Sequence, residues 1–597
     1  MRWATLAIRA GGDADDTETE AAEPRRHALR PAWQGLIALA IYLVVFILGF
    51  CLSLISNMDR PVVGQPEVDP NFYIWAWRWW VYAVTHGVNP LYSHQIGAPG
   101  GYNLAWATTS PPVALLLAPV TALFGPSMSF NLTLVLAPPT AAWAAFVLAR
   151  RVTGRFWASL PAGAIFGFNV YMLQHSVSGQ PNLTVTLLLP LIAYLMVLWW
   201  DGTLGRNAYI IWMTVAIALE FYVFIEAFAE MSLLWVFAVL IGLAVAGSDE
   251  GRRKVARLAL HTAIAFVAAM VLAAPYLIYA LRHQPTSFTR QEAHFSLDLA
   301  GLILPRKDRL LGMTFWGPSA AHVLANTAYL GVPLLLVLLA LGITGWRSSR
   351  LVRMLVIGFV VIIALAAGPN LIVDGKQLFA LPWGGIWSLP IFKSAEPIRF
   401  IDFAFLLLAL ALSLWLAQVT ASWLSRAAHW ALGAVALAAM FANLPTFGSV
   451  VPVPPPVHWK PATALKPTND VPAFFADGTY QKYLHPGETV VIVSHRGNAG
   501  MLFQAYTGFY FKIAGGFINA SLTSTDALPG PISAMLYPNR ARNKAFEHFV
   551  RSAKIGAIII ERSWSEQRMY NFGKLGLEGT TVGGVTIYST AHMKKLG

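Results

Sequence analysis

The chain has 597 residues, of which 56% are hydrophobic and only 12% are charged, and its formal net charge is +13. Apolar runs long enough to cross about 30 Å of hydrocarbon recur along most of the sequence, which excludes an ordinary soluble protein and predicts a polytopic membrane protein. The Lys and Arg residues fall in short segments between these runs rather than in a stripe interleaved with aromatic residues, so we expect no nucleic-acid partner.

The first 31 residues are predicted to form a disordered cytoplasmic tail. They mix acidic residues with Arg25, Arg26 and Arg30, and they lack the short apolar core and the cleavage site of a signal peptide. The apolar run that starts at Trp33 and continues to about residue 56 is therefore predicted to be an uncleaved anchor with the N-terminus inside. Its Cys51 is the single cysteine of the sequence, so we expect no intrachain disulfide.

An aromatic segment follows this anchor, directly after Asp69 and Pro70. Seven of the eleven residues from Phe72 to Tyr82 are aromatic, and Trp and Tyr concentrate where one end of the ring stays wet and the other enters hydrocarbon. We therefore expect a helix lying on the membrane surface, with Asp69 as its N-cap and Pro70 at its first position. The carboxylate is either a cap or a reactive group beside the bilayer, and one side chain can serve both roles.

Basic clusters mark the connections that we place in the cytoplasm. They are Arg150, Arg151 and Arg155; Arg206; Arg252, Arg253, Lys254 and Arg257; Arg347, Arg350 and Arg353; and Arg426. With all of them inside, the chain is predicted to cross the membrane about eleven times, at 33–56, 128–149, 156–174, 182–200, 207–224, 226–247, 254–281, 323–344, 351–368, 399–421 and 427–447. The apolar segment 112–125 is short for a crossing and would invert the later loops, so we expect it to be re-entrant or juxtamembrane.

This topology divides the chain into four parts. After the tail, 1–31, comes a transmembrane domain, 32–448, with three long outer loops at 57–111, 282–322 and 369–397, and functional residues favour such loops on a rigid scaffold. A proline-rich linker, 449–461, predicts a stiff connection. Residues 462–597 are expected to form a soluble extracytoplasmic α/β domain, with strands at 490–493, 556–560 and 582–588 and a helix at 543–553.

Motifs for several common reactions do not occur in the sequence. It contains no G-x-x-x-x-G-K phosphate loop, no H-E-x-x-H zinc motif and no G-x-S-x-G nucleophile motif. We therefore do not expect a primary pump, a zinc protease or a serine hydrolase.

Polar residues at the predicted outer ends of helices are candidates for substrate contacts. The turn-rich segment 97–103, which ends at Asn103, is suited to wrap a ligand. His175, Gln180 and Asn182 fall at an outer helix junction, where the imidazole either binds a hydroxyl or caps a helix end. Glu226 lies in or near hydrocarbon, where an ionisable group is costly and usually faces a polar cavity. Its alternative role is a hydrogen bond between helices.

Cations in the outer loops are not explained by the topology rule. They are Arg290, His294, Arg306, Lys307, Lys393 and Arg399. A lipid phosphate that leaves during a reaction needs such groups to neutralise its charge, and Arg suits bidentate phosphate contact. The alternative is contact with anionic lipid headgroups.

Several motifs occur in a distinctive order along most of the chain. They are Asp69 with Thr85–Pro90 at the end of the aromatic helix, Ala98–Leu104, Arg150–Gly154, His175 with Gly179–Leu183, Ile225–Glu226, Asp298–Pro305 and Pro397–Phe400, followed by Gln504–Gly508 and Gly515–Gly516. This arrangement resembles the GT-C superfamily of integral membrane glycosyltransferases, in a bacterial branch. The resemblance implies a sugar donor on a polyprenyl phosphate and a catalytic base from the first outer loop, a position that Asp69 matches. Gln180 and Ile225 depart from the His and Thr that relatives often carry there.

The residues and the resemblance together predict a glycosyltransferase of the bacterial cytoplasmic (inner) membrane. It is expected to transfer a sugar from a polyprenyl-phosphate donor to a hydroxyl of a glycan or glycolipid acceptor on the outer face, with inversion. Asp69 is expected to take the acceptor proton, with Glu67 as the alternative base. Arg399 and either Arg306 or Lys307 are expected to stabilise the leaving phosphate.

Two questions stay open at this stage. No cofactor is certain, because a lipid phosphate leaves readily without a metal, and the sequence does not decide whether a divalent metal takes part. The alternative function is a transporter or flippase of lipid-linked sugars or polysaccharide, which also uses carboxylates in the membrane and basic outer loops.

Overall fold

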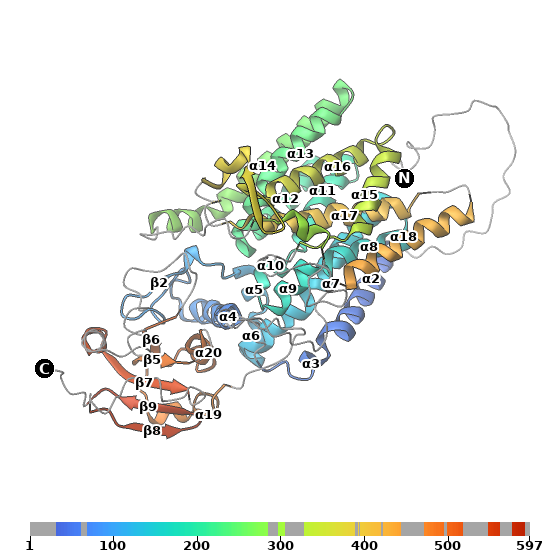
Figure 1. Ribbon diagram of the computed structural model, residues 1–597. Helices are drawn as coiled ribbons and strands as arrows, with labels where there is room; N and C mark the ends of the chain where they lie inside the picture. The colour runs from blue at the N-terminus through green and yellow to red at the C-terminus, as the bar shows by residue number, and fades with distance from the viewer. Residues whose placement is uncertain are drawn as a thin grey trace, which may run out of the picture.

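The structure is a computed structural model that describes residues 31–60, 68–283, 296–304, 328–388, 392, 395–418, 422–442, 471–494, 498–516, 547–561 and 576–591. Residues 1–30 of the predicted tail, the linker 449–461 and most of the outer loop 282–322 lie outside these ranges. Figure 1 shows an elongated molecule with a bundle of helices at one end and a small sheet at the other.

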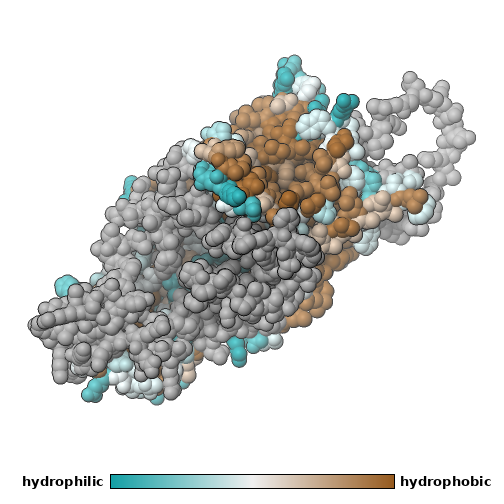
Figure 2. All heavy atoms as spheres, viewed as in Figure 1, coloured by the Kyte–Doolittle hydropathy of each residue, from teal (hydrophilic) through white to brown (hydrophobic). Residues whose placement is uncertain are grey.

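Apolar helices form the bundle. They are α2 (Pro31–Phe46), α7 (Pro126–Thr153), α8 (Phe156–Gly167), α9 (Val170–Val177), α10 (Pro181–Thr184), α11 (Leu188–Trp200), α12 (Arg206–Val223), α13 (Ile225–Val245), α14 (Asp249–Arg282), α15 (Val332–Gly345), α16 (Arg350–Ala366), α17 (Ile401–Leu416) and α18 (Trp423–Ala442). Helices α7 and α17 are largely buried, whereas α2, α14 and α18 expose most of their apolar residues. Figure 2 shows a broad area of exposed apolar side chains, in brown, on one face of the bundle, as expected of helices that face lipid.

The number of membrane crossings is smaller by length and composition than the sequence predicts. Seven of the described helices are long and apolar enough to cross, or eight when α8 and α9, which are bent by 44°, count as one span. Helices overlap all eleven predicted segments, but some are short, such as α15 with 14 residues. The prediction of about eleven crossings is therefore not confirmed. Hydropathy does not distinguish apolar residues that pack against other helices from apolar residues that face lipid, so it does not fix the number of crossings.

The two ends of the bundle differ in character. At the start of α2, Gln34 Oε1 accepts a hydrogen bond of 2.8 Å from Nε of Arg150 in the arginine-rich end of α7. Helix α2 continues through a π-helical turn (Ile47–Cys51) into α3 (Leu52–Ile55). Just beyond α3, the carbonyl of Asp59 accepts a hydrogen bond of 3.1 Å from Tyr506 OH in the sheet domain. This basic end and the sheet domain therefore lie at opposite ends of the molecule.

Helix α4 (Val68–His86) is the predicted aromatic helix, and it lies between the bundle and the sheet domain (Figure 1). Trp75 and Trp77 are fully buried, and Trp79 is 2% exposed. The Trp75 ring stacks on Trp79 and meets the ring of Phe509 edge-on, with centroids 5.8 Å apart. The predicted helix is confirmed, but the expectation that these rings enter hydrocarbon is wrong, because the surrounding protein supplies their apolar contacts.

The rest of the first outer loop contains short elements. Strands β1 (Tyr92–Ser93) and β2 (Tyr102–Asn103) pair antiparallel. Helices α5 (Pro111–Leu116) and α6 (Ala118–Phe124) cover most of the predicted re-entrant or juxtamembrane segment. They have six and seven residues, so neither is long enough to cross hydrocarbon.

A five-stranded sheet of order β6-β5-β7-β9-β8 forms the core of the C-terminal domain. Its strands are β5 (Thr489–Val493), β6 (Lys512–Ile513), β7 (Ile555–Glu561), β8 (Gly579–Val582) and β9 (Val585–Ser589). β5 pairs parallel with β6 and β7, and β9 pairs antiparallel with β7 and β8. The segment predicted as one strand, 582–588, is instead a hairpin, because Gly583 and Gly584 take positive φ angles of 55° and 88° and reverse the chain.

Helix α20 (Ala499–Tyr506) connects β5 to β6 and attaches the sheet domain to α4. The fully buried Gln504 accepts a hydrogen bond of 2.7 Å from Trp75 Nε1. Its amide nitrogen donates to the carbonyls of Gln95 and Phe511, each at 2.7 Å. One side chain therefore joins α4, the first outer loop and the sheet domain.

The predicted third outer loop carries a second hairpin. Strands β3 (Asn370–Val373) and β4 (Lys376–Ala380) pair antiparallel. The buried carboxylate of Asp298 accepts hydrogen bonds from the backbone N–H groups of Asp374 at 2.9 Å and Gly375 at 2.7 Å. This carboxylate therefore fixes the hairpin turn to the end of the second outer loop.

Candidate active site

Asp69 lies in the first turn of α4, one position inside the helix, which begins at Val68. The prediction that it is the N-cap is therefore wrong, because Asp69 is the second residue of the helix and not the residue before it. Helix ends inferred from sequence commonly shift by one or two residues. Its side chain is partly exposed, and Oδ2 accepts a hydrogen bond of 2.6 Å from Nε2 of Gln180. The carboxylate is thus tied to a segment more than a hundred residues away.

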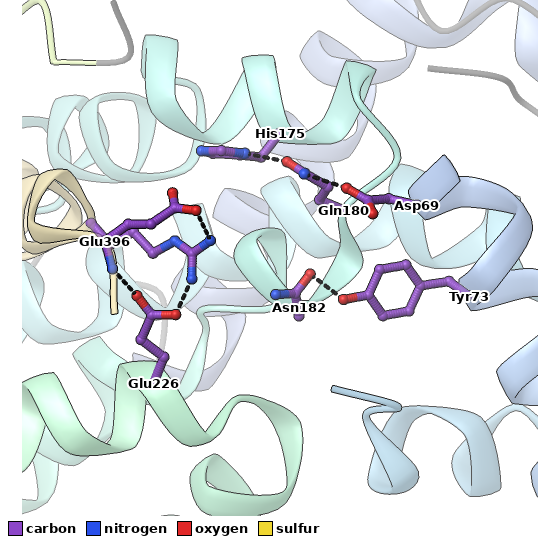
Figure 3. Close-up of polar contacts among 8 residues, drawn as sticks. Asp69, Tyr73, His175, Gln180, Asn182, Glu226 and Glu396 are labelled. Atoms are coloured by element: carbon purple, nitrogen blue, oxygen red, sulfur yellow. Dashed lines mark hydrogen bonds and ion pairs between the residues drawn. The ribbon is translucent and has the colours of Figure 1, made fainter. Parts of the chain in front are cut away.

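Gln180 and His175 continue from this carboxylate in a hydrogen-bonded row (Figure 3). Gln180 donates to Asp69 through its nitrogen, so its oxygen faces the imidazole, and His175 Nδ1 lies 2.5 Å from Gln180 Oε1. An amide oxygen only accepts, so Nδ1 carries the proton. His175 and Gln180, which the sequence predicted as substrate contacts, therefore lie in one hydrogen-bonded row with Asp69, and their contact with substrate stays a prediction.

A glycine turn brings this row into place. Gly179 lies between α9 and α10 with φ at +67°, and a Cβ there would come within 2.6 Å of Pro70 Cγ. The turn therefore contacts the first turn of α4 closely. Since Gln180 follows directly, its side chain reaches Asp69.

Asn182 contacts the same face of α4. Its Oδ1 accepts a hydrogen bond of 2.6 Å from the hydroxyl of Tyr73, and both residues are buried. Tyr73 follows Asp69 by four residues, so the two side chains share one helical face. Figure 3 shows both pairs along that face.

Glu226 and Arg399 form an ion pair beside this row. Arg399 also lies 3.1 Å from a carboxylate oxygen of Glu396, and its guanidinium sits 5.3 Å above the ring of Phe224. The second oxygen of Glu226 accepts the backbone N–H of Glu396 at 2.6 Å. Two carboxylates therefore hold the cation that the sequence predicted to contact a phosphate.

The carboxyl group of Asp69 is electrostatically distinctive. Burial raises its pKa above the ordinary value, while the hydrogen bond from Gln180 and the positive charge of Arg399 lower it in part. Removal from water disfavours the charged form, and a carboxylate with a raised pKa binds a proton more strongly. Such a group suits proton abstraction from an alcohol.

The other predicted site residues do not join this cluster. Asn103 accepts the N–H of Ala105 at 2.9 Å and donates to the carbonyl of His283 at 2.6 Å, so its amide ties β2 to the end of α14. The remaining candidates lie outside the described residues: Glu67, Arg290, His294, Arg306, Lys307 and Lys393. Their roles stay predictions.

Two residues of the cluster were missed in the sequence. Tyr73 was one of seven aromatic residues among the eleven from Phe72 to Tyr82, and only its spacing of four from Asp69 distinguished it. Glu396 stands three residues before Arg399, a spacing that favours an ion pair. Within the part of the chain that the structure describes, no group of three or more His, Cys, Asp or Glu side chains is placed to hold a metal ion.

Solved structures of membrane glycosyltransferases match this arrangement of elements. The arabinofuranosyltransferase AftD from Mycobacteria matches with a TM-score of 0.55 at 15% identity, over 94% of this chain and 40% of that one. The archaeal oligosaccharyltransferase AglB from Archaeoglobus fulgidus, in complex with an inhibitory peptide and a dolichol-phosphate, matches with a TM-score of 0.54 at 12% identity, over 90% and 70%. ArnT from Cupriavidus metallidurans bound to undecaprenyl phosphate has a TM-score of 0.48 at 13% identity, over 95% and 99%.

The first two matches show that the chain has the fold of the GT-C glycosyltransferases, which confirms the resemblance inferred from the motifs. The chain spans less than half of the length of AftD. No curated protein matches the sequence significantly. A family model described as "Domain of unknown function (DUF6311)" matches residues 37–442, which include α4, the row from Asp69 to His175 and the ion pair of Arg399. The chain therefore belongs to the DUF6311 family.

Proposed function

We propose that this protein transfers a sugar from a polyprenyl-phosphate donor to a hydroxyl of a glycan or glycolipid acceptor. The observation that supports this most directly is the Asp69 carboxylate, which is partly buried at the start of α4 and oriented by Gln180 within a GT-C fold. A fixed carboxylate with a raised pKa is the group that such a reaction needs as a base.

The proposed reaction is a single displacement at the anomeric carbon. Asp69 takes the proton of the acceptor hydroxyl while the acceptor oxygen forms a bond to that carbon. The bond from the carbon to the phosphate oxygen breaks, and the electron pair leaves with the polyprenyl phosphate. Attack and departure occur on opposite faces of the sugar, so the anomeric configuration inverts.

The cations around the site have separate proposed roles. Arg399 is held by Glu226 and Glu396, so we assign it to positioning and to the electrostatic environment of Asp69. Arg306 or Lys307 then remains as the proposed contact of the leaving phosphate. This division changes the expectation from the sequence, in which Arg399 was also a phosphate contact.

The nature of the donor is supported by a structural neighbour. AglB was solved with an inhibitory peptide and with a dolichol-phosphate, a lipid phosphate of the class proposed here. The apolar exterior of the bundle provides the membrane setting for such a lipid. The arginine-rich end lies opposite α4 and the sheet domain, so by the positive-inside rule we place the site on the outer face of a bacterial inner membrane.

The experiment that tests this proposal measures whether the sugar–phosphate bond of the donor is broken. Purified protein in liposomes is given a panel of polyprenyl phosphates, each carrying a radiolabelled sugar, together with glycan acceptors from a bacterial envelope. We expect labelled acceptor and an equal amount of free polyprenyl phosphate. A transporter or flippase would move the intact donor across the bilayer, so redistribution of label without loss of the sugar–phosphate bond contradicts the proposal.

A further inference from the structure

A polar pocket lies on the other side of α4 from Asp69. It has a volume of about 330 Å³, and its lining includes Asp59, Arg78, Thr121, Phe124, Ser127 and Tyr506. Arg78 follows Asp69 by nine residues, which is about two and a half helical turns, so its side chain leaves α4 on the opposite face. The pocket is therefore separate from the proposed active site, and it lies where α4, the α6–α7 corner and α20 meet (Figure 1).

Arg78 is a cation that forms no ion pair with the described residues of this pocket. Its side chain is partly buried, and among the described residues none forms a hydrogen bond or an ion pair with its guanidinium. Burial lowers the pKa of Arg78. A partly desolvated guanidinium is costly unless a hydrogen-bonding anion meets it, so the pocket favours an anionic ligand.

The hydroxyl groups that line the pocket already form hydrogen bonds within the protein. Tyr506 donates to the carbonyl of Asp59 at 3.1 Å and shares a hydrogen bond of 2.8 Å with Ser127. Thr121 donates to Ser129 at 2.8 Å. The pocket also receives the N-terminus of α7, a helix of 28 residues with Pro126 at its start, and such an end carries a partial positive charge. Arg78 and this helix end line the same pocket, and both favour an anion there.

Asp59 supplies the opposite charge at the edge of the same pocket. Its side chain is exposed, and the structure shows no ion pair between Asp59 and Arg78. Burial raises the pKa of Tyr506, and the negative charge of Asp59 raises it further. One pocket thus presents a cation and an anion that do not neutralise each other, which matches a ligand with both charges.

One lining residue of the pocket and two further residues of the short helices α5 and α6 expose large apolar side chains. Phe124, which lines it, is 63% exposed, and Leu123 and Leu116 on α6 and α5 are 76% and 78% exposed. Short helices with large exposed apolar side chains lie at membrane interfaces, where these side chains enter the acyl region. The pocket therefore opens beside a surface suited to acyl chains.

We propose that this pocket binds the headgroup of a zwitterionic phospholipid, with the phosphate on Arg78 and the N-terminus of α7 and the ammonium group on Asp59. The acyl chains lie along Leu116, Leu123 and Phe124. The volume is within the range of small-molecule sites, about 300 to 1,000 Å³. This lipid is a ligand separate from the sugar donor, and its binding does not depend on the glycosyltransferase proposal.

Native mass spectrometry of the purified protein tests this assignment. The protein is titrated with phosphatidylethanolamine or phosphatidylglycerol of identical acyl chains, and separately with inorganic phosphate. We expect tighter binding of phosphatidylethanolamine by the wild type. Arg78→Gln should weaken the binding of both lipids about tenfold, the loss expected for one charge-assisted pair, and Arg78→Lys should restore part of it. Asp59→Asn should remove the preference between the two lipids and leave phosphatidylglycerol bound.

Arg282→Gln is the matched control, because Arg282 is an exposed arginine at the end of α14 outside the pocket. It should bind both lipids as the wild type does, and thermal melts should show that all variants are folded. Wild-type affinity of Arg78→Gln for both lipids overturns the site. If Asp59→Asn still prefers phosphatidylethanolamine to phosphatidylglycerol, Asp59 does not bind the ammonium group. Binding of inorganic phosphate through Arg78, without any lipid that depends on Arg78, identifies free phosphate as the ligand and overturns the lipid assignment.

Discussion

The carboxylate of Asp69 is oriented by an amide, and that amide is itself held by an imidazole. An amide fixes the carboxylate without neutralising it, so the group keeps its capacity to take a proton. Arg399 acts on Asp69 through its charge, while its hydrogen bonds go to Glu226 and Glu396. Orientation and charge are therefore supplied by different residues, which makes them separable by mutation.

Gln180→Leu removes the hydrogen bond that lowers the pKa of Asp69. The pKa of Asp69 should therefore rise further. Because a general base works only when it is deprotonated, the variant should lose activity at a higher pH than the wild type does when the pH is lowered. The measurement is the pH profile of kcat/KM for sugar transfer. Gln481→Leu, at an exposed glutamine of the sheet domain, is the control and should keep the wild-type profile. An unchanged acidic limb in Gln180→Leu would contradict the orienting role.

Glu226→Gln should shift the acidic limb of the pH profile of kcat/KM to lower pH, opposite to the shift expected for Gln180→Leu. Without the Glu226 charge, the positive charge of Arg399 is less compensated and should lower the pKa of Asp69, so activity persists to lower pH. Loss of one partner of a mostly buried ion pair should also destabilise the fold by about 3 kcal/mol. Thermal melts and the pH profile report the two effects, with Glu250→Gln at an exposed position as control. A limb shifted to higher pH would show that Arg399 does not act on Asp69 in this way.

Single residues were predictable from sequence only where a local rule applied. Asp69 stood out because it precedes an aromatic helix and matches the position of the base in a known superfamily. The contact of Gln180 with Asp69 depends on how α9 and α10 pack on α4, and no local pattern encodes a contact across more than a hundred residues. The partner of Arg399 was hidden for the same reason, since Glu226 lies on a different helix.

At the scale of elements, the turn between α9 and α10 determines where Gln180 lies. Gly179→Ala adds a Cβ within 2.6 Å of Pro70 Cγ at a φ of +67°. The left-handed backbone should cost about 1 kcal/mol, and the clash about 2 kcal/mol more. Since Pro70 is next to Asp69, we also expect reduced transfer activity.

Gly202→Ala is the matched control for this substitution. Gly202 has a φ of +79°, but nothing lies within 4 Å of the added Cβ. It should show the backbone cost alone and full activity, measured by thermal melts and the transfer assay. Equal stability and equal activity of the two variants would contradict a close contact between the turn and α4.

Elements were predicted well where periodicity and turn chemistry agreed. The aromatic helix, the strands β5 and β7 and the apolar helices all follow from such patterns. The β8–β9 hairpin was missed because an apolar run around two adjacent glycines was interpreted as one strand. The burial of the α4 tryptophans was missed because the composition of an aromatic helix is the same whether lipid or protein covers it.

At the scale of the whole molecule, the sheet domain is attached through α20 to the helix that carries Asp69. Gln504→Leu should leave Trp75 Nε1 and the Phe511 carbonyl without their partners in a buried interface. The expected destabilisation of this attachment is about 3 kcal/mol. Limited proteolysis should release the C-terminal domain faster than in the wild type, whereas the exposed Gln481→Leu should not. Equal proteolysis of both variants would contradict the role of Gln504 as the joint.

The sequence predicted the overall division of the molecule, with apolar helices, basic ends on one side and an α/β domain on the other. It could not give the number of crossings, because apolar residues that pack on other helices contribute to hydropathy as lipid-facing ones do. The docking of the sheet domain over α4 was also not predictable, since it depends on contacts such as Trp75 with Gln504 between distant segments.

The central claim is that Asp69 takes the proton of the acceptor. Its most direct test is the rate of sugar transfer by Asp69→Asn in liposomes, compared with the wild type and with Asp249→Asn at an exposed aspartate of α14. Asparagine keeps the shape and the contact to Gln180 but accepts no proton at neutral pH. The account predicts a loss of at least about a hundredfold for Asp69→Asn, the usual range for a general base, with donor binding retained and Asp249→Asn fully active. Wild-type rates in a folded Asp69→Asn protein would contradict it.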